Sequence, residues 1–156
     1  MLRGCMSWLE VGAMSRDVCR MDAQQYVSIL KPDLNPTLDR CAADPSLPPR
    51  PQLIFQQDNN PKHTSRLARD WFLAGGIQAM PWPAQSPDLN PIEHLWAHLK
   101  RRIGSYPEVL GGILELWDRV RKEWPKITVE ACRSLIESMP RRVEAVFRAR
   151  RGSTRY

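Results

Sequence analysis

The sequence of 156 residues has no run of about 18 apolar residues, the length that a membrane-spanning helix needs. Its four cysteines include no Cys-x-x-Cys pair, and its three histidines complete no zinc-binding pattern. The first residues, "MLRGCMSWLEVGAM", contain an Arg and a Glu but no unbroken apolar stretch, so they do not resemble a secretory signal. We therefore expect reduced, mostly buried cysteines in an intracellular protein that has no membrane partner.

The composition is that of one folded domain with a sizeable core. Of the 156 residues, 42% are hydrophobic and six are Trp, and the length suits a single domain. The 14 prolines are many for such a chain, and several lie in "KPDLNPTLDRCAADPSLPPRPQ". We therefore expect residues 31–51 to be an irregular, Pro-rich connection.

Positive charge is concentrated in the last third of the chain. The net charge is +6, and residues 100–156 contain 14 of the 23 basic residues but only 7 of the 17 acidic ones. Such a basic excess attracts polyanions, and nucleic acid first among them. The alternative is that these charges only form the solvated face of a helix.

The N-terminal part of the sequence predicts a hairpin followed by a helix. Residues 2–9 and 13–20 flank a Gly-containing turn, which is typical of two paired strands. In "MDAQQYVSILK", Asp22 can cap a helix and Gln25 occupies the capping-box position.

A strand, a helix and a second strand are predicted next. Residues 52–57, "QLIFQQ", suit a strand buried on both faces, and residues 77–82, "IQAMPW", suit a second short strand. The helix between them begins at Thr64 or Ser65 and ends at Gly75-Gly76. A unit of this kind predicts parallel pairing of the two strands.

The remaining sequence is predicted to be helical. One helix start is indicated by Asn90 as a cap, Pro91 at the first helical position and Glu93 at the third helical position. Two or three further helices follow, the last of them broken or restarted at Pro140. We divide the chain into residues 1–105 and a basic helical C-terminal extension of the same domain, residues 106–156.

Two carboxylates stand at marked positions in this arrangement. Asp58 follows the carboxyl end of the 52–57 strand, the edge at which open α/β sheets bind ligands. Glu93 lies on the first turn of the helix that follows the neighbouring strand. If the two lie close together, a divalent cation offsets their repulsion. Mg²⁺ accepts one or two carboxylates with water and phosphate oxygens, and two ions roughly 3.5–4 Å apart support phosphodiester chemistry.

Each of these residues also has a simpler interpretation. Glu93 can be the third member of a capping box, and Asp58 can open an Asx-type turn with the Asn-Asn-Pro that follows it. His63 can be an ordinary loop or capping histidine. Taken singly, neither acid identifies an enzyme.

Together, the segments "LIFQQDNNPKHT" and "MPWPAQSPDLNPIEHLWAHLKRRI" closely resemble the second half of the catalytic domain of Tc/mariner-type DNA transposases. The motifs that carry the resemblance are "QQDNxPxHT" and "WPxQSPDLNPIExLWxxLK". Asp58 and Glu93 have 34 residues between them, the interval of one main branch of that superfamily. The resemblance is strong between residues 53 and 103 and weaker over the rest of the chain.

The resemblance implies a metal-dependent enzyme of the DDE type. The implied fold is RNase H-like α/β, a mixed sheet with flanking helices and a helical C-terminal extension. Three acids would bind two Mg²⁺ or Mn²⁺ ions, cut DNA at the transposon ends and join those ends to target DNA. Asp58 matches the second acid and Glu93 the third. The implied location is the nucleus, and a homodimer is one option.

The sequence departs from the family pattern at its beginning. The family's first acid lies on the first strand, upstream of the segment that resembles "GCMSW", and no acid before Asp58 stands in such a context. We therefore expect a truncated fold without the first catalytic Asp or the N-terminal helix-turn-helix region, with weak metal binding and little or no activity alone. The acids considered are Glu10, Asp17, Asp22, Asp33, Asp39 and Asp44.

A missing first strand would leave the 52–57 strand without a neighbour. We expect that the hairpin docks directly against that strand, or is poorly placed, or that the exposed edge pairs with another chain. Marginal stability would follow, because unpaired buried backbone groups cost about 1–3 kcal/mol each.

Two alternatives compete with the enzymatic function. The chain could be a non-enzymatic DNA-binding remnant whose basic residues contact phosphates, or a fragment that does not fold stably. The nucleic-acid-binding residues predicted from the sequence are Lys62, His63, Lys100, Arg101, Arg102, Arg141, Arg142, Arg148, Arg150 and Arg151.

Overall fold

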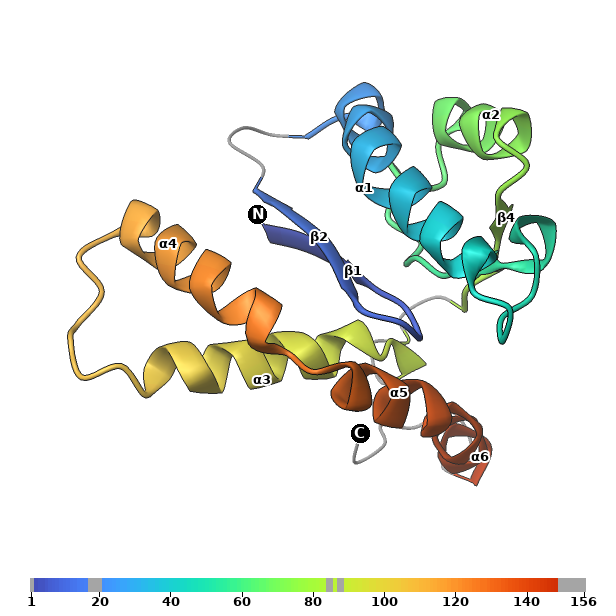
Figure 1. Cartoon of the computed structure of the whole chain (residues 1–156). Coiled ribbons are helices and arrows are strands. Elements are labelled where there is room, and N and C mark those ends of the chain that lie inside the picture. The colour runs from blue at the N-terminus through green and yellow to red at the C-terminus, as the bar shows by residue number, and fades with distance from the viewer. Residues whose placement is uncertain (1, 17–20, 84–85, 87–88, 149–156) are drawn as a thin grey trace. The chain divides into compact units, whose positions relative to one another are not determined.

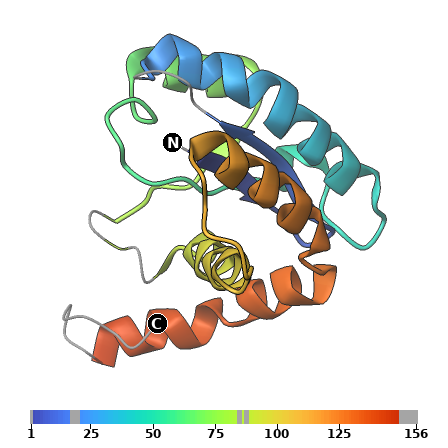
Figure 2. The same ribbon diagram turned by 90° about the vertical axis from the view of Figure 1, so that its left-hand side faces the viewer.

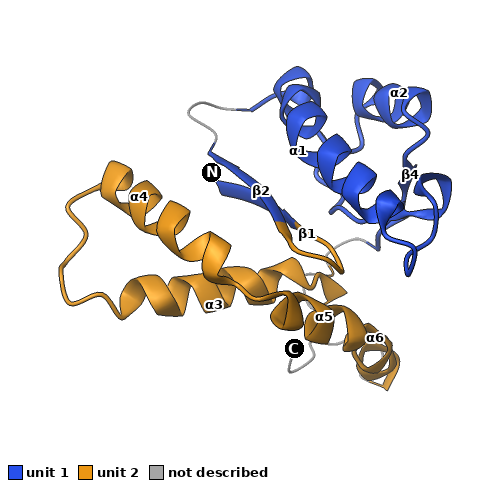
Figure 3. Ribbon diagram, in the orientation of Figure 1, with its two compact units in different colours: residues 1–5, 12–85 blue, residues 6–11, 86–156 orange. Residues whose placement is uncertain are grey.

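The computed structural model describes residues 2–16, 21–83, 86 and 89–148. The chain divides into two compact units, the first formed by residues 1–5 and 12–85 and the second by residues 6–11 and 86–156 (Figure 3). The boundary between the units after the hairpin lies between residues 85 and 86. The boundary expected from the sequence lies between residues 105 and 106, and it stays a prediction.

The predicted hairpin is present, but its turn lies at residues 7–10 and Gly12 belongs to a strand, so the predicted Gly-containing turn is wrong. Residues 17–20 of the predicted second strand lie outside the described residues. Strand β1 (Leu2–Met6) pairs with β2 (Val11–Arg16) in a two-stranded sheet (Figure 1). Gly12 is needed on β2 because a Cβ there would overlap the Sγ of Cys5 and lie 3.1 Å from the Oγ1 of Thr37. The tip of the hairpin belongs to the second unit, where Arg133 donates its Nε–H to the Trp8 carbonyl at 3.1 Å.

Helix α1 (Ala23–Ala43) begins as the sequence predicts and ends much later. Asp22 accepts a hydrogen bond from the Gln25 N–H at 2.8 Å, and the Gln25 side chain accepts one from the Asp22 N–H at 3.2 Å, which completes the capping box. The helix then continues through Pro32 and Pro36. The prediction of an irregular connection is therefore wrong for residues 31–43.

Burial explains why α1 continues past its prolines. Pro32 and Pro36 are exposed and lie four residues apart, on one outward face, where the carbonyls they leave without an N–H partner can be hydrated. Leu34 and Leu38, on the opposite face, are only 4% and 8% exposed. Burying a Leu side chain contributes about 1.5–3 kcal/mol, so packing offsets the unfavourable propensity of the prolines.

The predicted strand–helix–strand unit follows, with shorter strands than expected. The 3₁₀ turn η1 (Arg50–Gln52) precedes β3 (Ile54–Phe55), and β3 pairs in parallel with β4 (Gln78–Ala79). Between them lies α2 (Arg66–Ala74), capped by the Ser65 side chain and followed by Gly76 at φ 60°. The parallel pairing is confirmed.

Strand β3 is not buried on both faces, so that part of the prediction is wrong. Ile54 is 54% exposed. In the described part of the chain β3 and β4 form one two-stranded sheet and the hairpin forms another. The hairpin therefore does not extend the sheet of β3, and one flank of β3 has no paired strand among the described residues.

The core of the first unit lies between α1 and α2. The two helices pack against each other, and α2 also contacts β4. Phe72 of α2 meets Phe55 of β3 with ring centroids 5.6 Å apart. The buried members of this core are Met21, Tyr26, Val27, Leu34, Leu38, Ala68, Phe72 and Ile77.

The second unit is helical. Helix α3 (Ile92–Gly104) leads into the loop at residues 105–112, and α4 (Ile113–Glu123) returns and packs against it. The 3₁₀ turn η3 (Trp124–Lys126), α5 (Val129–Glu137) and α6 (Met139–Arg148) complete the unit. Figure 2 looks nearly along α3, with α4 on one side and α5 and α6 on the other. Pro140 lies in the first turn of α6, so it restarts the helix as predicted.

A carboxylate at the end of α4 ties the second unit together. Glu123 is 3% exposed. It accepts hydrogen bonds from Tyr106 at 2.8 Å, Arg102 at 2.7 Å and Lys126 at 2.6 Å. The Lys126 hydrogen bond, followed by that of Tyr106, holds the pKa of Glu123 below its ordinary value.

Among the described helices none is both long and apolar enough to cross a membrane.

Candidate active site

Asp58 follows β3 directly and is held by the loop that it opens. Its Oδ1 accepts a hydrogen bond from the Asn60 N–H at 3.0 Å, which makes an Asx-type turn, as the simpler interpretation predicts. The side chain is nevertheless 58% exposed. Both of its hydrogen bonds go to Oδ1, and among the described residues Oδ2 accepts none. The turn and a ligand role are therefore compatible.

The second partner of Asp58 is His63, from the end of the same loop. His63 is 8% exposed, and its Nδ1 lies 2.5 Å from the Asp58 Oδ1. Its Nε2 lies 3.1 Å from a guanidinium nitrogen of Arg3. The imidazole stacks on the ring of Tyr26, with centroids 4.2 Å apart. Three elements of the first unit, β1, α1 and the 58–63 loop, thus meet at this histidine.

Burial sets the ionisation of the groups around Asp58. It lowers the pKa of His63 below the ordinary value of 6.5, although the Asp58 charge opposes that shift. His63 is therefore mostly neutral at neutral pH. Burial also raises the pKa of the Tyr26 hydroxyl, so this group remains a hydrogen-bond donor. It donates to the Gln57 side chain, next to Asp58 in the sequence.

Glu93 lies in the first turn of α3, one position earlier in the helix than predicted. The helix begins at Ile92, Pro91 is its N-cap, and no side chain in the described part of the sequence caps it. The predicted capping box, with Glu93 as third member, is therefore wrong. Glu93 is exposed, and within the described ranges no side chain makes a hydrogen bond or ion pair with its carboxylate.

The two acids carry oxygen ligands of the kind that Mg²⁺ and Mn²⁺ take. Exposed Asp58 has an oxygen with no hydrogen-bond partner among the described residues, and Glu93 has an exposed carboxylate, and both fit that chemistry. Asp58 belongs to the first unit and Glu93 to the second, so their convergence stays a prediction. Among the described residues, no three His, Cys, Asp or Glu side chains form a cluster of the kind that holds a metal ion.

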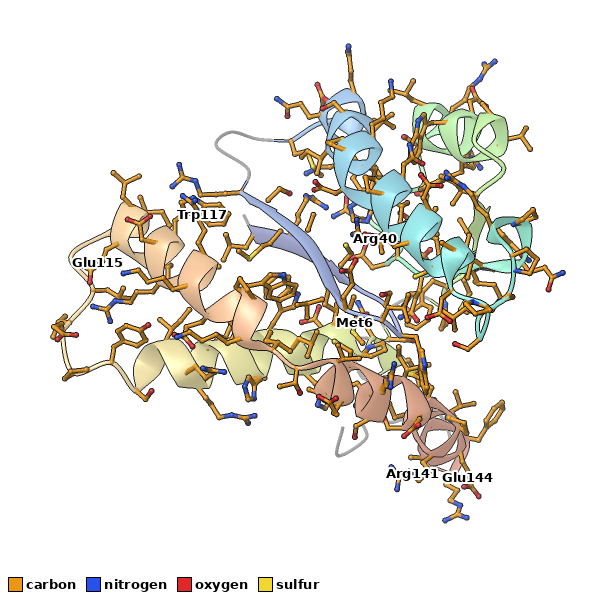
Figure 4. All side chains as sticks on the ribbon, viewed as in Figure 1. Met6, Arg40, Glu115, Trp117, Arg141 and Glu144 are labelled. Carbon is orange, nitrogen blue, oxygen red and sulfur yellow. The ribbon has the colours of Figure 1, made fainter. Side chains whose placement is uncertain are left out.

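The basic residues predicted to bind nucleic acid differ in their surroundings. Lys100 and Arg101 on α3 are exposed, and Lys62 is half-buried. On α6, Arg141 is exposed and projects away from the helix with Glu144 (Figure 4). These positions suit contact with phosphates, and that role stays a prediction.

Other predicted DNA contacts do not fit their positions. His63 is buried against Tyr26, and Arg142 is 3% exposed with its Nε–H on the Ser138 hydroxyl at 2.7 Å. Neither side chain is placed to reach a phosphate. Arg102 makes an ion pair with buried Glu123 and so acts within the second unit.

The remaining predicted contacts are Arg148, Arg150 and Arg151. Arg148 is exposed but makes an ion pair with Glu144 at 2.6 Å. Arg150 and Arg151 lie outside the described residues.

The sequence interpretation missed Arg3, Tyr26 and Gln57 as neighbours of Asp58. Gln57 donates its amide N–H to the His63 carbonyl at 3.2 Å, and the Arg3 guanidinium lies over the Tyr26 ring at 5.5 Å from its centroid. Gln57 was within the "QQDN" motif and could have been noticed there, whereas the position of Arg3 in a hairpin gave no signal.

Comparison with solved structures confirms the predicted fold. The chain matches the Mos1 transposase catalytic domain solved with raltegravir and Mg, with a TM-score of 0.82, 21% identity and coverage of 98% of this chain and 76% of that one. It matches a Mos1 mariner paired-end complex with Mn at a TM-score of 0.81 and 22% identity, over 98% of this chain and 44% of that one. The fold is therefore that of the Mos1 catalytic domain, RNase H-like and mixed α/β.

Comparison of sequences defines the family. The DDE superfamily endonuclease family matches residues 24–108, a range that includes both Asp58 and Glu93. The Tc1 transposase of Caenorhabditis elegans is 36% identical over 157 residues, which cover 100% of this chain and 54% of the relative. The chain belongs to the DDE superfamily endonucleases, as a homologue of the catalytic domain of Tc1/mariner transposases. It spans about half the length of the curated relatives it matches.

Proposed function

We propose that this chain provides two of the metal-binding carboxylates, Asp58 and Glu93, of a DDE transposase that cleaves DNA and transfers its strands. The observation that carries the proposal is the state of Asp58. Its Oδ1 is fixed by two donors while Oδ2 has no partner among the described residues, within a segment that matches the family. Glu93 adds an exposed carboxylate in the same segment.

The roles of the residues follow from their chemistry. When bound, Mg²⁺ or Mn²⁺ supplies a Lewis acid that activates a water or hydroxyl and stabilises the leaving oxygen of a phosphodiester. Asp58 and Glu93 would hold the ions. A site of two ions needs a third, bridging acid, and no acid before Asp58 in this sequence matches it. We therefore propose that this chain alone has little or no cleavage activity.

Metal binding tests the assignment of the two acids. Free Mn²⁺ is measured by electron paramagnetic resonance during titration of the chain, and Asp58→Asn and Glu93→Gln are each expected to weaken binding. Asp70→Asn is the matched control, because Asp70 is an exposed acid on α2 that makes an ion pair with Arg66 at 3.5 Å. Affinity that is unchanged in both Asp58→Asn and Glu93→Gln would contradict the proposal.

A plasmid-nicking assay with Mn²⁺ tests the activity. We expect no cleavage by the chain above that of an Asp58→Ala variant. Robust cleavage that Asp58→Ala abolishes would show that the two acids suffice and that the proposed inactivity is wrong. The Mos1 paired-end and strand-transfer complexes support transposon DNA as a partner. We also propose target DNA and a second copy of the chain as partners, and the nucleus as the location.

A non-enzymatic DNA-binding function is the second candidate. It is favoured by the exposed cations on α3 and α6, including Lys100, Arg101 and Arg141, since cations that neutralise phosphates produce salt-dependent binding. DNA binding that weakens with salt and survives loss of both Asp58 and Glu93 would favour this candidate. Binding that requires the metal would favour the first.

A further inference from the structure

A chain of hydrogen bonds from β1 reaches the Asp58 carboxylate through His63. Arg3 contacts the Nε2 of His63 at 3.1 Å, and the Nδ1 of His63 contacts the Asp58 Oδ1 at 2.5 Å. Arg3 is 55 residues from Asp58 along the chain, so only the fold brings the three groups together. Among the described side chains, only His63 makes a hydrogen bond or ion pair with the Asp58 carboxylate.

The direction of these hydrogen bonds follows from the chemistry of the donors. A guanidinium has only N–H donors and no acceptor. The Nε2 of His63 must therefore accept, and in the neutral imidazole the proton is then on Nδ1. His63 consequently donates to the Asp58 Oδ1. Arg3 thus selects the His63 tautomer in which the uncharged Nδ1–H group faces the Asp58 carboxylate.

Packing holds the imidazole in that orientation. One face stacks on Tyr26, whose hydroxyl is engaged by Gln57, and Gln57 in turn donates to the His63 carbonyl at 3.2 Å. Because the ring and its backbone are both fixed, the His63 N–H can fix the rotation of the Asp58 side chain. The Asn60 N–H on the same oxygen adds a second constraint.

We propose that Arg3 and His63 form a positioning pair that fixes the Asp58 carboxylate, so that Oδ2 faces a divalent cation. The inference rests on the proposed function, since it assigns a purpose to residues behind one of the proposed metal ligands. Groups that orient ligands in this way typically change metal affinity by about 10–100-fold when they are replaced. His63 is thus a positioning residue and not a contact for DNA.

Two substitutions of His63 separate positioning from packing. The amide nitrogen of Asn lies near the place of Nδ1, and that of Gln lies near the place of Nε2. Both variants remove the stacked ring, but only His63→Asn keeps a donor for Asp58. We expect the Mn²⁺ affinity of His63→Asn to stay within about twofold of wild type and that of His63→Gln to fall about tenfold.

The outcomes distinguish the inference from the proposed function. If Asp58→Asn weakens Mn²⁺ binding while His63→Asn and His63→Gln do not differ from each other, the positioning role is wrong and the ligand role of Asp58 stands. If Asp58→Asn has no effect, the proposed ligand fails, and the inference fails with it. Far-UV circular dichroism of each variant confirms that the fold is kept.

The tautomer gives a second test that does not depend on the metal. Nitrogen-15 spectra of the imidazole, recorded above the ordinary pKa of histidine, are expected to show a protonated Nδ1 and an unprotonated Nε2. Arg3→Lys keeps a cationic donor and should keep that tautomer, whereas Arg3→Met should release it and lower Mn²⁺ affinity. A proton on Nε2 in the wild-type chain would overturn the inference.

Discussion

Replacement of Pro32 by Ala in α1 is expected to stabilise the chain. Pro32 lies in the interior of a 21-residue helix, is exposed, and cannot donate to the carbonyl of Ser28. Proline is about 3 kcal/mol less favourable than Ala at such a position. Restored freedom of the unfolded chain offsets about 0.4–1 kcal/mol of this difference.

The expected net gain in the free energy of unfolding is therefore about 2 kcal/mol. For a chain of this size, 1 kcal/mol corresponds to roughly 2–4 °C in Tm, so we expect an increase of roughly 4–8 °C. Urea unfolding and thermal melts followed by circular dichroism measure both quantities. No packing is lost, because the buried face of α1 carries other residues, among them Leu34 and Leu38.

Pro140→Ala provides the matched control. Pro140 is also exposed, but it lies in the first turn of α6, where proline is well tolerated and the N–H groups lack acceptors within the helix. Its replacement should change stability much less than that of Pro32. If Pro32→Ala is neutral or destabilising, then α1 needs the local bend of its proline, and the reasoning from propensity is refuted.

Three other substitutions test the packing of the two units. Gly12→Ala should destabilise by about 1–3 kcal/mol through overlap with the Cys5 Sγ, and Cys5→Ala in the same chain should restore most of that loss in a denaturant titration. Leu95→Ala, at a site 2% exposed, should cost about 2–5 kcal/mol; a loss below 1 kcal/mol would show that α3 is loosely packed. The lowered pKa of Glu123 means that its contribution is present above pH 4.5 and is lost as the pH falls through the folded-state pKa. Tm should therefore fall less steeply below pH 4.5 in Glu123→Gln than in wild type, and parallel pH profiles would contradict this account.

Features fixed by neighbouring residues could be predicted from the sequence. The capping box of Asp22 and Gln25, the Ser65 cap and the restart at Pro140 each depend on side chains within a few positions of the backbone they bind. The Asx-type turn at Asp58 is of the same kind. The motif around Asp58 and Glu93 also identified the family, because it is specific in residue type and in spacing.

Features that depend on distant contacts could not be predicted. The continuation of α1 past Pro32 depends on burial of Leu34 and Leu38 in the core of the first unit, which local propensity does not report. Ile54 was expected to be buried because its neighbours in sequence are apolar, but exposure depends on which strands flank β3. His63 was predicted as a DNA contact, whereas its ring is buried and its Nε2 contacts Arg3, 60 residues away along the chain.

The two proposed ligands differ in how far folding has already ordered them. Asp58 has both donors on one oxygen and a buried imidazole behind it, so its rotamer is fixed before any cation arrives. The Glu93 carboxylate has no hydrogen-bond or ion-pair partner among the described residues, and the side chain would lose about 1.5–2 kcal/mol of conformational freedom when it binds a metal. Asp58 is thus the pre-organised ligand and Glu93 the one that adapts.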